Sequence, residues 1–394
     1  MDVFLSDWLN LLIRWAHLVV GIGWIGTSFY FMALDYSLDQ AERKSPGVLG
    51  TAWQVHGGGF YHVEKFTVAP PHLPAQLHWF RWEAYLTWAT GLALLVVQYY
   101  LHARAYLIDP AVLPLSPWQA VAISLTSLAL GWALYDGLCR SRLGENPLAL
   151  GVLVFALILL ASVFYTRVFS GRGAFIHVGA LVGSIMAANV FMVIIPNQKK
   201  MVAQLLRGET PDARYGRIGK QRSVHNNYLT LPVLVMMVSG HYPFLYGHPH
   251  AWLVVALILV SGGLIRHYLN RVDAGDDWSR FGWAAPFAAL ALVAAVYVTA
   301  PRPATGTAGT VPDADVLTLM QKHCIMCHAR APTHESFKEA PKNVTLETVE
   351  ELRKFAELVL TQTVHNKAMP LGNQTGMTDE ERARLGQWIS QAKP

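Results

Sequence analysis

The sequence carries little charge for its length. Only 14% of its 394 residues are Asp, Glu, Lys or Arg, whereas 53% are hydrophobic. This composition is unusual for a soluble protein and ordinary for an integral membrane protein. The first apolar segment also lacks a basic stretch before it, and its flank contains Asp2 and Asp7 instead. We therefore interpret this segment as a membrane span and not as a cleaved signal peptide.

Cysteine is scarce as well, with three residues in the chain, and so few cysteines limit the kinds of metal or redox site that they can form. Two of the three cysteines stand in the run Cys324-Ile325-Met326-Cys327-His328. A zinc site would need a second Cys/His pair nearby, but Cys139 lies within an apolar segment, where we expect it to pack. The apolar segments also lack the paired histidines of haem–copper oxidases. We interpret His248 and His250, which flank a proline, as part of a turn and not as a copper site.

Windows of about 20 apolar residues predict eight membrane-spanning helices. Together with a helical C-terminal segment they define an all-α fold class. We expect a polytopic helical bundle over residues 1–300, a flexible linker over residues 301–311 and a small domain over residues 312–394. The eight predicted spans are Leu9–Leu34, Trp82–Leu101, Trp118–Cys139, Pro147–Thr166, Ala174–Ile195, Tyr228–Tyr246, Ala251–Leu269 and Phe281–Ala300.

The spacing of Cys324, Cys327 and His328 is typical of a c-type haem attachment site. Two thiols on one helical turn can form thioethers to both vinyl groups of a haem, and the histidine that follows becomes an axial ligand of the iron. A redox dithiol or half of a zinc site is the alternative. The interpretation as a haem site implies a covalent haem c as cofactor.

A sixth iron ligand is expected from a downstream methionine. Met369 precedes Pro370 in a loop, and Met377 is the competing candidate; either could instead pack against the porphyrin. One predicted helix runs from Asp315 to Lys322, and another opens at Thr378 with an apolar face further along. This arrangement resembles the small class I cytochrome c domain.

The distribution of Lys and Arg predicts the orientation of the bundle. Residues 247–250, between the sixth and seventh spans, contain no Lys or Arg. Because basic residues are retained on the cytoplasmic side, both termini of an eight-span bundle fall in the periplasm. Haem c is attached in the same compartment, so both arguments predict a bacterial inner-membrane protein with a periplasmic C-terminal domain. The segment between the fifth and sixth spans carries Lys199, Lys200, Arg207, Arg214, Arg217, Lys220 and Arg222.

His17 lies inside the first predicted span, where a histidine is costly and usually functional. Gly21, Gly23 and Gly26 would let a flat macrocycle or a neighbouring helix approach closely. The pattern resembles the first helix of membrane protoporphyrinogen oxidases and copper-resistance membrane proteins, in which such a histidine is associated with haem. The alternative is a histidine that is hydrogen-bonded across the bundle.

The long segment between the first two spans is rich in His, Trp, Tyr, Lys and Glu beside three consecutive glycines, and we expect a functional loop without clear secondary structure. Over nearly its full length the chain resembles the bacterial membrane-bound urate oxidases (urate hydroxylases), which join a multi-span domain to a C-terminal cytochrome c. The matching stretches are Gly57-Gly58-Gly59-Phe60-Tyr61, residues 69–70, residues 77–85, Asn189-Val190-Phe191-Met192, residues 195–199 and residues 223–228.

This resemblance implies the oxidation of urate to 5-hydroxyisourate. Urate is planar and monoanionic near neutral pH, so its site should offer cations, amide donors and a proton acceptor. We expect a histidine to take a proton while an amide or a cation orients the ring. The candidate proton acceptors are His56, His62 and His225, and the candidate orienting residues are Asn226, Gln54, Lys65 and Arg81.

The same reaction releases two electrons, whereas one haem accepts one. We therefore expect a second carrier or two successive turnovers, and the simplest carrier is a haem b in the bundle with His17 and His177 as ligands. Water would supply the hydroxyl group without peroxide, and a cytochrome c or a terminal oxidase would accept the electrons. We expect no nucleic-acid partner. Composition and spacing alone leave two alternatives: a quinol-oxidising or haem-relay subunit, and a transporter-like anchor for a cytochrome.

Overall fold

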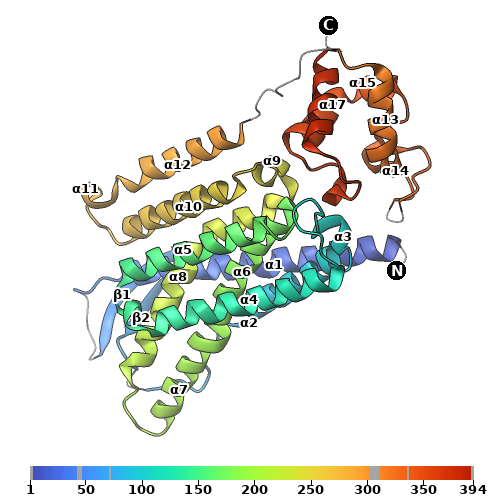
Figure 1. Cartoon of the computed structure of the whole chain (residues 1–394). Helices are drawn as coiled ribbons and strands as arrows, with labels where there is room; N and C mark the ends of the chain where they lie inside the picture. Colours follow the sequence, from blue (N-terminus) through green and yellow to red (C-terminus); the bar gives the residue numbers. More distant parts are fainter. Residues whose placement is uncertain (1–2, 42–46, 71, 301–309, 335–336, 392–394) are drawn as a thin grey trace.

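The computed structural model describes residues 3–41, 47–70, 72–300, 310–334 and 337–391, and these residues are mostly helical (Figure 1). Residues 301–309 of the predicted linker lie outside the described residues. The helices of the N-terminal bundle are α1 (Val3–Tyr36), α2 (Trp82–Leu94), α3 (Ala103–Tyr106), α4 (Pro117–Arg140), α5 (Pro147–Thr166), α6 (Gly171–Ala188), α7 (Ile195–Leu206), α8 (Ala213–Val238), α9 (Pro243–Tyr246), α10 (Ala251–Asp273), α11 (Trp278–Phe281) and α12 (Ala284–Thr299).

In the described residues, 6 helical stretches are long and apolar enough to cross a membrane. Five of them cover one predicted span each, and Trp278–Thr299 covers all but the last residue of the span Phe281–Ala300. The other two predicted spans also lie on helices, because α2 continues through a π-helical segment, Leu95–Tyr100, and α8 contains the start of the sixth span. The membrane-length stretches are Trp8–Tyr36, Pro117–Arg140, Pro147–Thr166, Gly171–Leu206, Ala251–Asp273 and Trp278–Thr299.

Polar side chains and proline define where several bundle helices begin. At the start of α4, both the backbone N–H and the hydroxyl of Ser116 donate to Gln119 Oε1. The Asn146 side chain accepts from two backbone N–H groups of the first turn of α5, and Pro147 follows where its missing N–H costs nothing. Such caps satisfy the first N–H groups of helices that then run through apolar surroundings.

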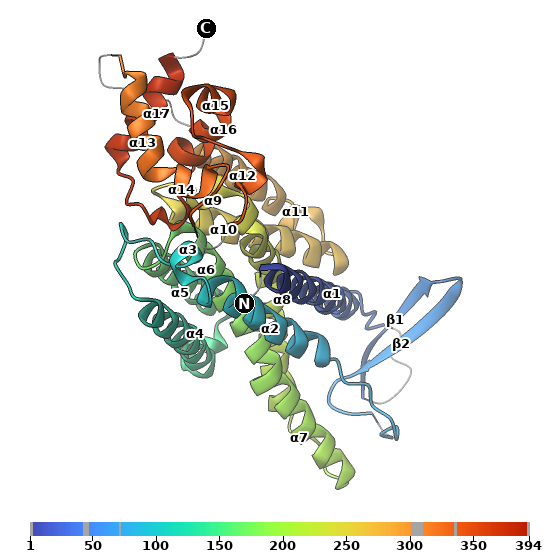
Figure 2. The same ribbon diagram turned by 90° about the vertical axis from the view of Figure 1, so that its right-hand side faces the viewer.

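Residues 48–66 form a β-hairpin that projects from the bundle (Figure 2). Strand β1 (Val48–His56) pairs antiparallel with β2 (Gly59–Phe66). The prediction of a loop without clear secondary structure is therefore wrong here, and the all-α class holds only for the rest of the described chain. Gly57 and Gly58 have φ angles of +58° and +81°, which suit the two-residue turn of a hairpin.

Helix α6 lies at the centre of the bundle, and most of its side chains are buried. It packs on α8 through glycines: a Cβ at Gly179 would lie 2.9 Å from the Cβ of Met236, and one at Gly183 would lie 3.5 Å from the methyl carbon of Met237. Small residues at such a crossing let two helix backbones approach closely.

A smaller helical domain follows the bundle. It contains α13 (Asp313–His323), α14 (Ile325–His328), α15 (Val349–Lys354), α16 (Ala356–Val359) and α17 (Asp379–Gln391). The two helices predicted on either side of the cysteine run are confirmed as α13 and α17. Thr378 Oγ1 accepts from the Glu381 N–H as the predicted cap of α17. The apolar core of this domain includes Val316, Leu352, Leu385, Trp388 and Ile389.

The C-terminal domain contacts the end of the bundle near α3 and α9 (Figures 1 and 2). Two glycines allow this contact. A Cβ at Gly372 would lie 2.6 Å from the carbonyl oxygen of Arg104, and a Cβ at Gly247 would lie 1.8 Å from the carbonyl oxygen of Asn366. The loop that carries Met369 therefore lies directly against the bundle.

Candidate functional site

Residues Cys324 to His328 form one helical turn around α14. His328 Nδ1 lies 2.8 Å from the carbonyl oxygen of Val344. Because a carbonyl only accepts, Nδ1 carries the proton and Nε2 keeps its lone pair for a metal. Burial raises the pKa of the Cys324 thiol to about 12, whereas a redox dithiol has a lowered thiol pKa. These residues fit a covalently bound haem better than a reactive dithiol.

The two candidates for the sixth ligand have different surroundings. Met377 is 3% exposed and belongs to the apolar core of the C-terminal domain. Met369 is half-buried, and the Arg382 guanidinium donates to its carbonyl oxygen and to that of Thr363. Since the Met377 side chain already fills the core, this arrangement favours Met369 as the ligand.

His248 and His250 lie in a turn. The backbone N–H of His250 donates to His248 Nδ1 over 3.1 Å. Within the described ranges, no group of three or more His, Cys, Asp or Glu side chains is arranged to hold a metal ion.

His17, on α1, has the arrangement of a metal-binding histidine. Its Nδ1 lies 3.1 Å from the carbonyl oxygen of Thr87 and 3.0 Å from Thr90 Oγ1. The carbonyl requires the proton on Nδ1, which leaves the Nε2 lone pair available. A Cβ at Gly91 would lie 3.1 Å from the imidazole ring, so the ring rests against the backbone of α2. His17 thus bonds across the bundle and also fits a haem ligand.

His177, on α6, is fully buried, and both of its ring nitrogens have partners. Nδ1 lies 2.7 Å from the Gly173 carbonyl oxygen, and Nε2 lies 2.7 Å from Ser124 Oγ, which also bonds the Tyr100 hydroxyl. The Phe169 ring packs 4.5 Å from the imidazole. In this packing His177 does not fit an iron ligand, and no described contact joins it to His17.

Three consecutive residues of α8 contact three different helices. His225 Nδ1 lies 2.8 Å from the hydroxyl of Tyr135 on α4. Asn226 donates to the carbonyl oxygen of Met186 on α6 and accepts from Asn189. Asn227 accepts from Asn270 on α10. A helix turns by about 100° per residue, which explains how neighbours in sequence reach separate partners. The predicted residues His225 and Asn226 therefore lie in a buried polar layer.

A buried ion pair stabilises this layer. Arg222 is 1% exposed, and its guanidinium donates to Asp136 over 2.7 Å and to Asn189 over 3.2 Å. The Tyr135 ring packs 5.1 Å from the same guanidinium. Asn189 also donates to the Tyr135 hydroxyl, so the ion pair and His225 belong to one hydrogen-bonded network.

The structure places the hairpin candidates apart from His225. His56 and His62 are exposed on β1 and β2, where the His62 ring packs 4.5 Å from the Trp53 ring. Lys65 forms an ion pair with Asp35, which also pairs with Lys220. In the part of the chain that the structure describes, no hydrogen bond or ion pair joins these side chains to His225 or Asn226.

The remaining orienting candidates also lie outside the His225 network. Arg81 is half-buried just before α2, and its guanidinium carbon lies 5.5 Å from the Trp82 ring centre. Gln54 Oε1 accepts from the Tyr30 hydroxyl over 2.7 Å. Sequence reasoning did not single out several polar residues of the bundle interior, although some of them lie within a predicted span, where a polar residue is a signal. These residues are Tyr135, Asp136, Arg222, Asn227, Arg266 and Asn270; Asp136 is half-buried and the others are buried.

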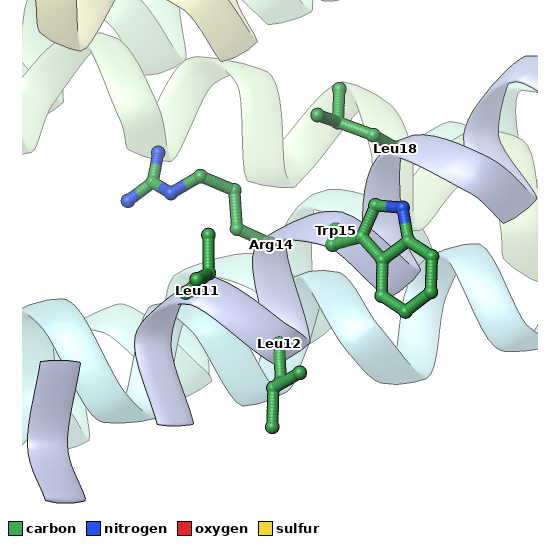
Figure 3. A pocket seen from close by; sticks show the side chains of 5 residues that line it. All are labelled: Leu11, Leu12, Arg14, Trp15 and Leu18. Atoms are coloured by element: carbon green, nitrogen blue, oxygen red, sulfur yellow. The ribbon is translucent and has the colours of Figure 1, made fainter. Parts of the chain in front are cut away.

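The outer face of α1 bears an apolar hollow of about 300 Å³. The side chains of Arg14 and Leu12, which line it, point to different sides of the helix (Figure 3). Arg14 donates to Gln98 over 2.8 Å. One helix lines the hollow, whereas ligand sites are enclosed by several elements. This surface is typical of a lipid-facing helix. Its lining residues are Leu11, Leu12, Arg14, Trp15 and Leu18.

These features define a helical bundle that is compatible with membrane insertion and has more interior polar groups than an inert anchor needs. Residues 3–300 match the family described as urate oxidase N-terminal, and the chain belongs to this family. No curated protein and no solved structure matches the chain.

Proposed function

We propose that the protein is a membrane-bound urate oxidase that passes electrons to a covalent haem c. The family match over residues 3–300 carries this proposal. In the balanced reaction, urate and one water give 5-hydroxyisourate, two protons and two electrons. The hydroxyl oxygen comes from water, so no peroxide forms.

In the C-terminal cytochrome c domain of this proposal, Cys324 and Cys327 would hold the haem, and His328 and Met369 would be the ligands of its iron. Haem c with these ligands supplies a one-electron acceptor of raised potential. Arg382 keeps the Met369 loop in position by donating to its carbonyl oxygen. The contact of this loop with the bundle at Gly372 would keep a haem held by Met369 close to the end of the bundle.

The second electron needs a second carrier or a second turnover. We assign His17 as a ligand of a haem b in the bundle because its Nε2 lone pair is available. The predicted partner ligand, His177, would serve only if the hydrogen bond from Ser124 to Nε2 were broken.

Among the candidate proton acceptors, His225 is the one inside the bundle. When Nδ1 donates to Tyr135, Nε2 is free to accept a proton that the oxidation releases. The Tyr135 hydroxyl, 2.8 Å away, accepts the hydrogen bond from Nδ1 and so holds the ring in the tautomer whose Nε2 can take the proton. Asn226 keeps the neighbouring turn of α8 fixed through its bond to Met186. His56 and His62 would act only if the exposed hairpin met the substrate.

The proposal places the protein in a bacterial inner membrane with eight spans. Its C-terminal domain faces the periplasm, where it passes electrons to a cytochrome c or a terminal oxidase. The 6 membrane-length helices support the membrane location. The excess of Lys and Arg between α6 and the apolar half of α8 supports the orientation.

Anaerobic reduction of the haem tests this proposal. Purified membranes are given urate or a quinol without oxygen, and haem absorption is recorded. We expect urate to reduce the haem and 5-hydroxyisourate to form in a ratio of one per two electrons. Reduction by the quinol with no response to urate would instead support a quinol-oxidising subunit. No reduction by either compound would support a passive anchor.

A further inference from the structure

Among the described residues of the bundle two arginines are buried, and only one of them has a carboxylate partner. Arg222 pairs with Asp136. Arg266, on α10, is 4% exposed and forms no ion pair with an Asp or Glu in the described residues. Asp273 acts on it only from about two helical turns further along α10. Burying a guanidinium without a carboxylate is expensive, so this site has the chemistry of an anion receptor.

The partners of Arg266 are neutral and come from three helices. Its Nη2 donates to Asn270 over 2.9 Å, and its Nε lies 3.4 Å from Asn227 Oδ1 on α8. Phe29 of α1 packs against one face of the guanidinium, with its ring centre 4.1 Å away. The guanidinium is therefore fixed in one plane, with one face covered by an aromatic ring.

Two groups of this cluster retain free donor capacity. Asn227 is fully buried, its Oδ1 accepts from Arg266 and Asn270, and its Nδ2 has no hydrogen-bond partner in the described chain. The structure also gives Arg266 Nη1 no hydrogen bond to a described residue. A buried amide donor without a partner costs free energy comparable to a lost hydrogen bond. A planar anion bound at the guanidinium edge would satisfy both donors.

We propose that Arg266 and Asn227 bind the anionic edge of the substrate in the seam between α1, α8 and α10. This inference rests on the proposed oxidation of urate and names the residues that hold its negative charge. Of the two cations expected from the sequence, Lys65 already pairs with Asp35, and Arg81 lies against the Trp82 ring. Arg222 already pairs with Asp136.

A lipid phosphate could in principle supply the same negative charge. The burial of Arg266 beneath Phe29 favours a small planar ligand over a headgroup at the surface. Access to the guanidinium edge requires the half-buried Phe29 ring to move, and this ring lies on α1, many of whose large apolar side chains are exposed.

Equilibrium dialysis with radiolabelled urate tests the assignment without catalysis. The full-length holoenzyme is kept anaerobic and fully reduced by dithionite, so that urate binds and does not react. The variants are Arg266→Gln, Arg266→Lys and Asn227→Asp. Asn227→Asp is the sharpest of them, because it places a carboxylate beside Arg266 with almost no change in shape. Arg271→Gln, on the same helix and paired with Asp276, is the matched control.

We expect Arg266→Gln to weaken urate binding by about 10- to 100-fold, the effect of losing a hydrogen bond to a charged group. Asn227→Asp should weaken it to a similar extent while the thermal midpoint of the protein stays the same or rises. Arg266→Lys should retain part of the affinity, and Arg271→Gln should bind like the unmodified enzyme.

Equal urate affinity in the unmodified enzyme, Arg266→Gln and Asn227→Asp would overturn the assignment. It would also be overturned if these variants kept their urate affinity but lost co-purified anionic phospholipid. If the unmodified enzyme itself bound no urate, the proposed function would fail, a result distinct from failure of the Arg266 assignment alone.

Discussion

The imidazole of His328 is fixed by the backbone of Val344: Nδ1 lies 2.8 Å from that carbonyl oxygen. In the neutral imidazole this leaves the lone pair on Nε2 available to a metal, and the two thiols precede His328 on the same helical turn. We predict that the full-length protein keeps its haem on a denaturing gel, whereas the double variant Cys324→Ala, Cys327→Ala does not. Haem staining measures this. Zinc in place of haem, found by elemental analysis, would contradict the prediction.

The two methionines should respond differently to substitution. Met369→Ala should remove an axial ligand, and we expect a changed haem absorption spectrum and a lower reduction potential with the domain still folded. Met377→Ala should lower the free energy of unfolding by about 2–5 kcal/mol, the usual cost of truncating a buried methionine, because Met377 is 3% exposed. Redox titration and thermal unfolding separate the effects. A shifted potential with Met377→Ala and none with Met369→Ala would exchange the assignments.

His17 should be required for any haem in the bundle. His17→Ala removes the imidazole that Thr87 and Thr90 orient, so we expect the b-type contribution to the pyridine haemochrome spectrum to disappear while the c-type contribution remains. Thr90→Val is a milder change, because the Thr87 carbonyl still accepts from Nδ1, and it should retain the haem. An unchanged ratio of the two haem types in His17→Ala would remove His17 as a ligand.

Sequence reasoning was most successful where spacing along one element determines the geometry. One turn holds Cys324, Cys327 and His328, and the helices on either side of that run are confirmed. It failed at Gly57-Gly58, where two glycines between β-branched and aromatic runs form a hairpin turn. The many His, Trp, Tyr, Lys and Glu residues of this segment led to the prediction of an irregular loop, although the glycine pair is typical of a hairpin turn.

The buried partners could not be predicted, because they come from helices far apart in the chain. Asn227 points to α10 while His225 points to α4, and periodicity does not say which helix covers which face of α8. Whether a buried arginine has a carboxylate partner depends on the same packing. Asp136 lies 86 positions before Arg222, and no spacing rule connects them.

The Asp136 carboxylate pairs with a buried and an exposed arginine, and this difference predicts unequal costs for two substitutions. Asp136→Asn leaves the Arg222 guanidinium, which is 1% exposed, without a counter-charge, and we expect a loss of about 3–5 kcal/mol in the free energy of unfolding. Arg140 pairs with the same carboxylate, but its side chain is 68% exposed. Arg140→Gln should therefore cost at most about 1 kcal/mol. Thermal unfolding in detergent measures both, and equal losses would contradict a special role for the buried pair.

The C-terminal domain should lose stability in acid through Glu381. Partial burial alone would raise its pKa, but hydrogen bonds from Lys322 and the Thr378 backbone, together with the close contact of His323 Nε2, lower the pKa of Glu381 to about 2. An unfolded glutamate has a pKa of about 4.3. The stabilisation is therefore complete above about pH 4.5 and is lost as the pH falls toward 2.

Hydrogen exchange of α13 and α17 at several pH values, corrected for intrinsic rates, measures this loss. In the unmodified protein we expect the protection of these backbone amides to fall between about pH 4.5 and 2. In Glu381→Gln it should fall less, because position 381 then has no carboxylate to protonate. Glu380→Gln removes an exposed carboxylate from the same turn but leaves the contacts with Lys322 and His323 intact, and it should follow the unmodified protein. Identical acid profiles for Glu381→Gln and the unmodified protein would show that other carboxylates control acid unfolding of this domain.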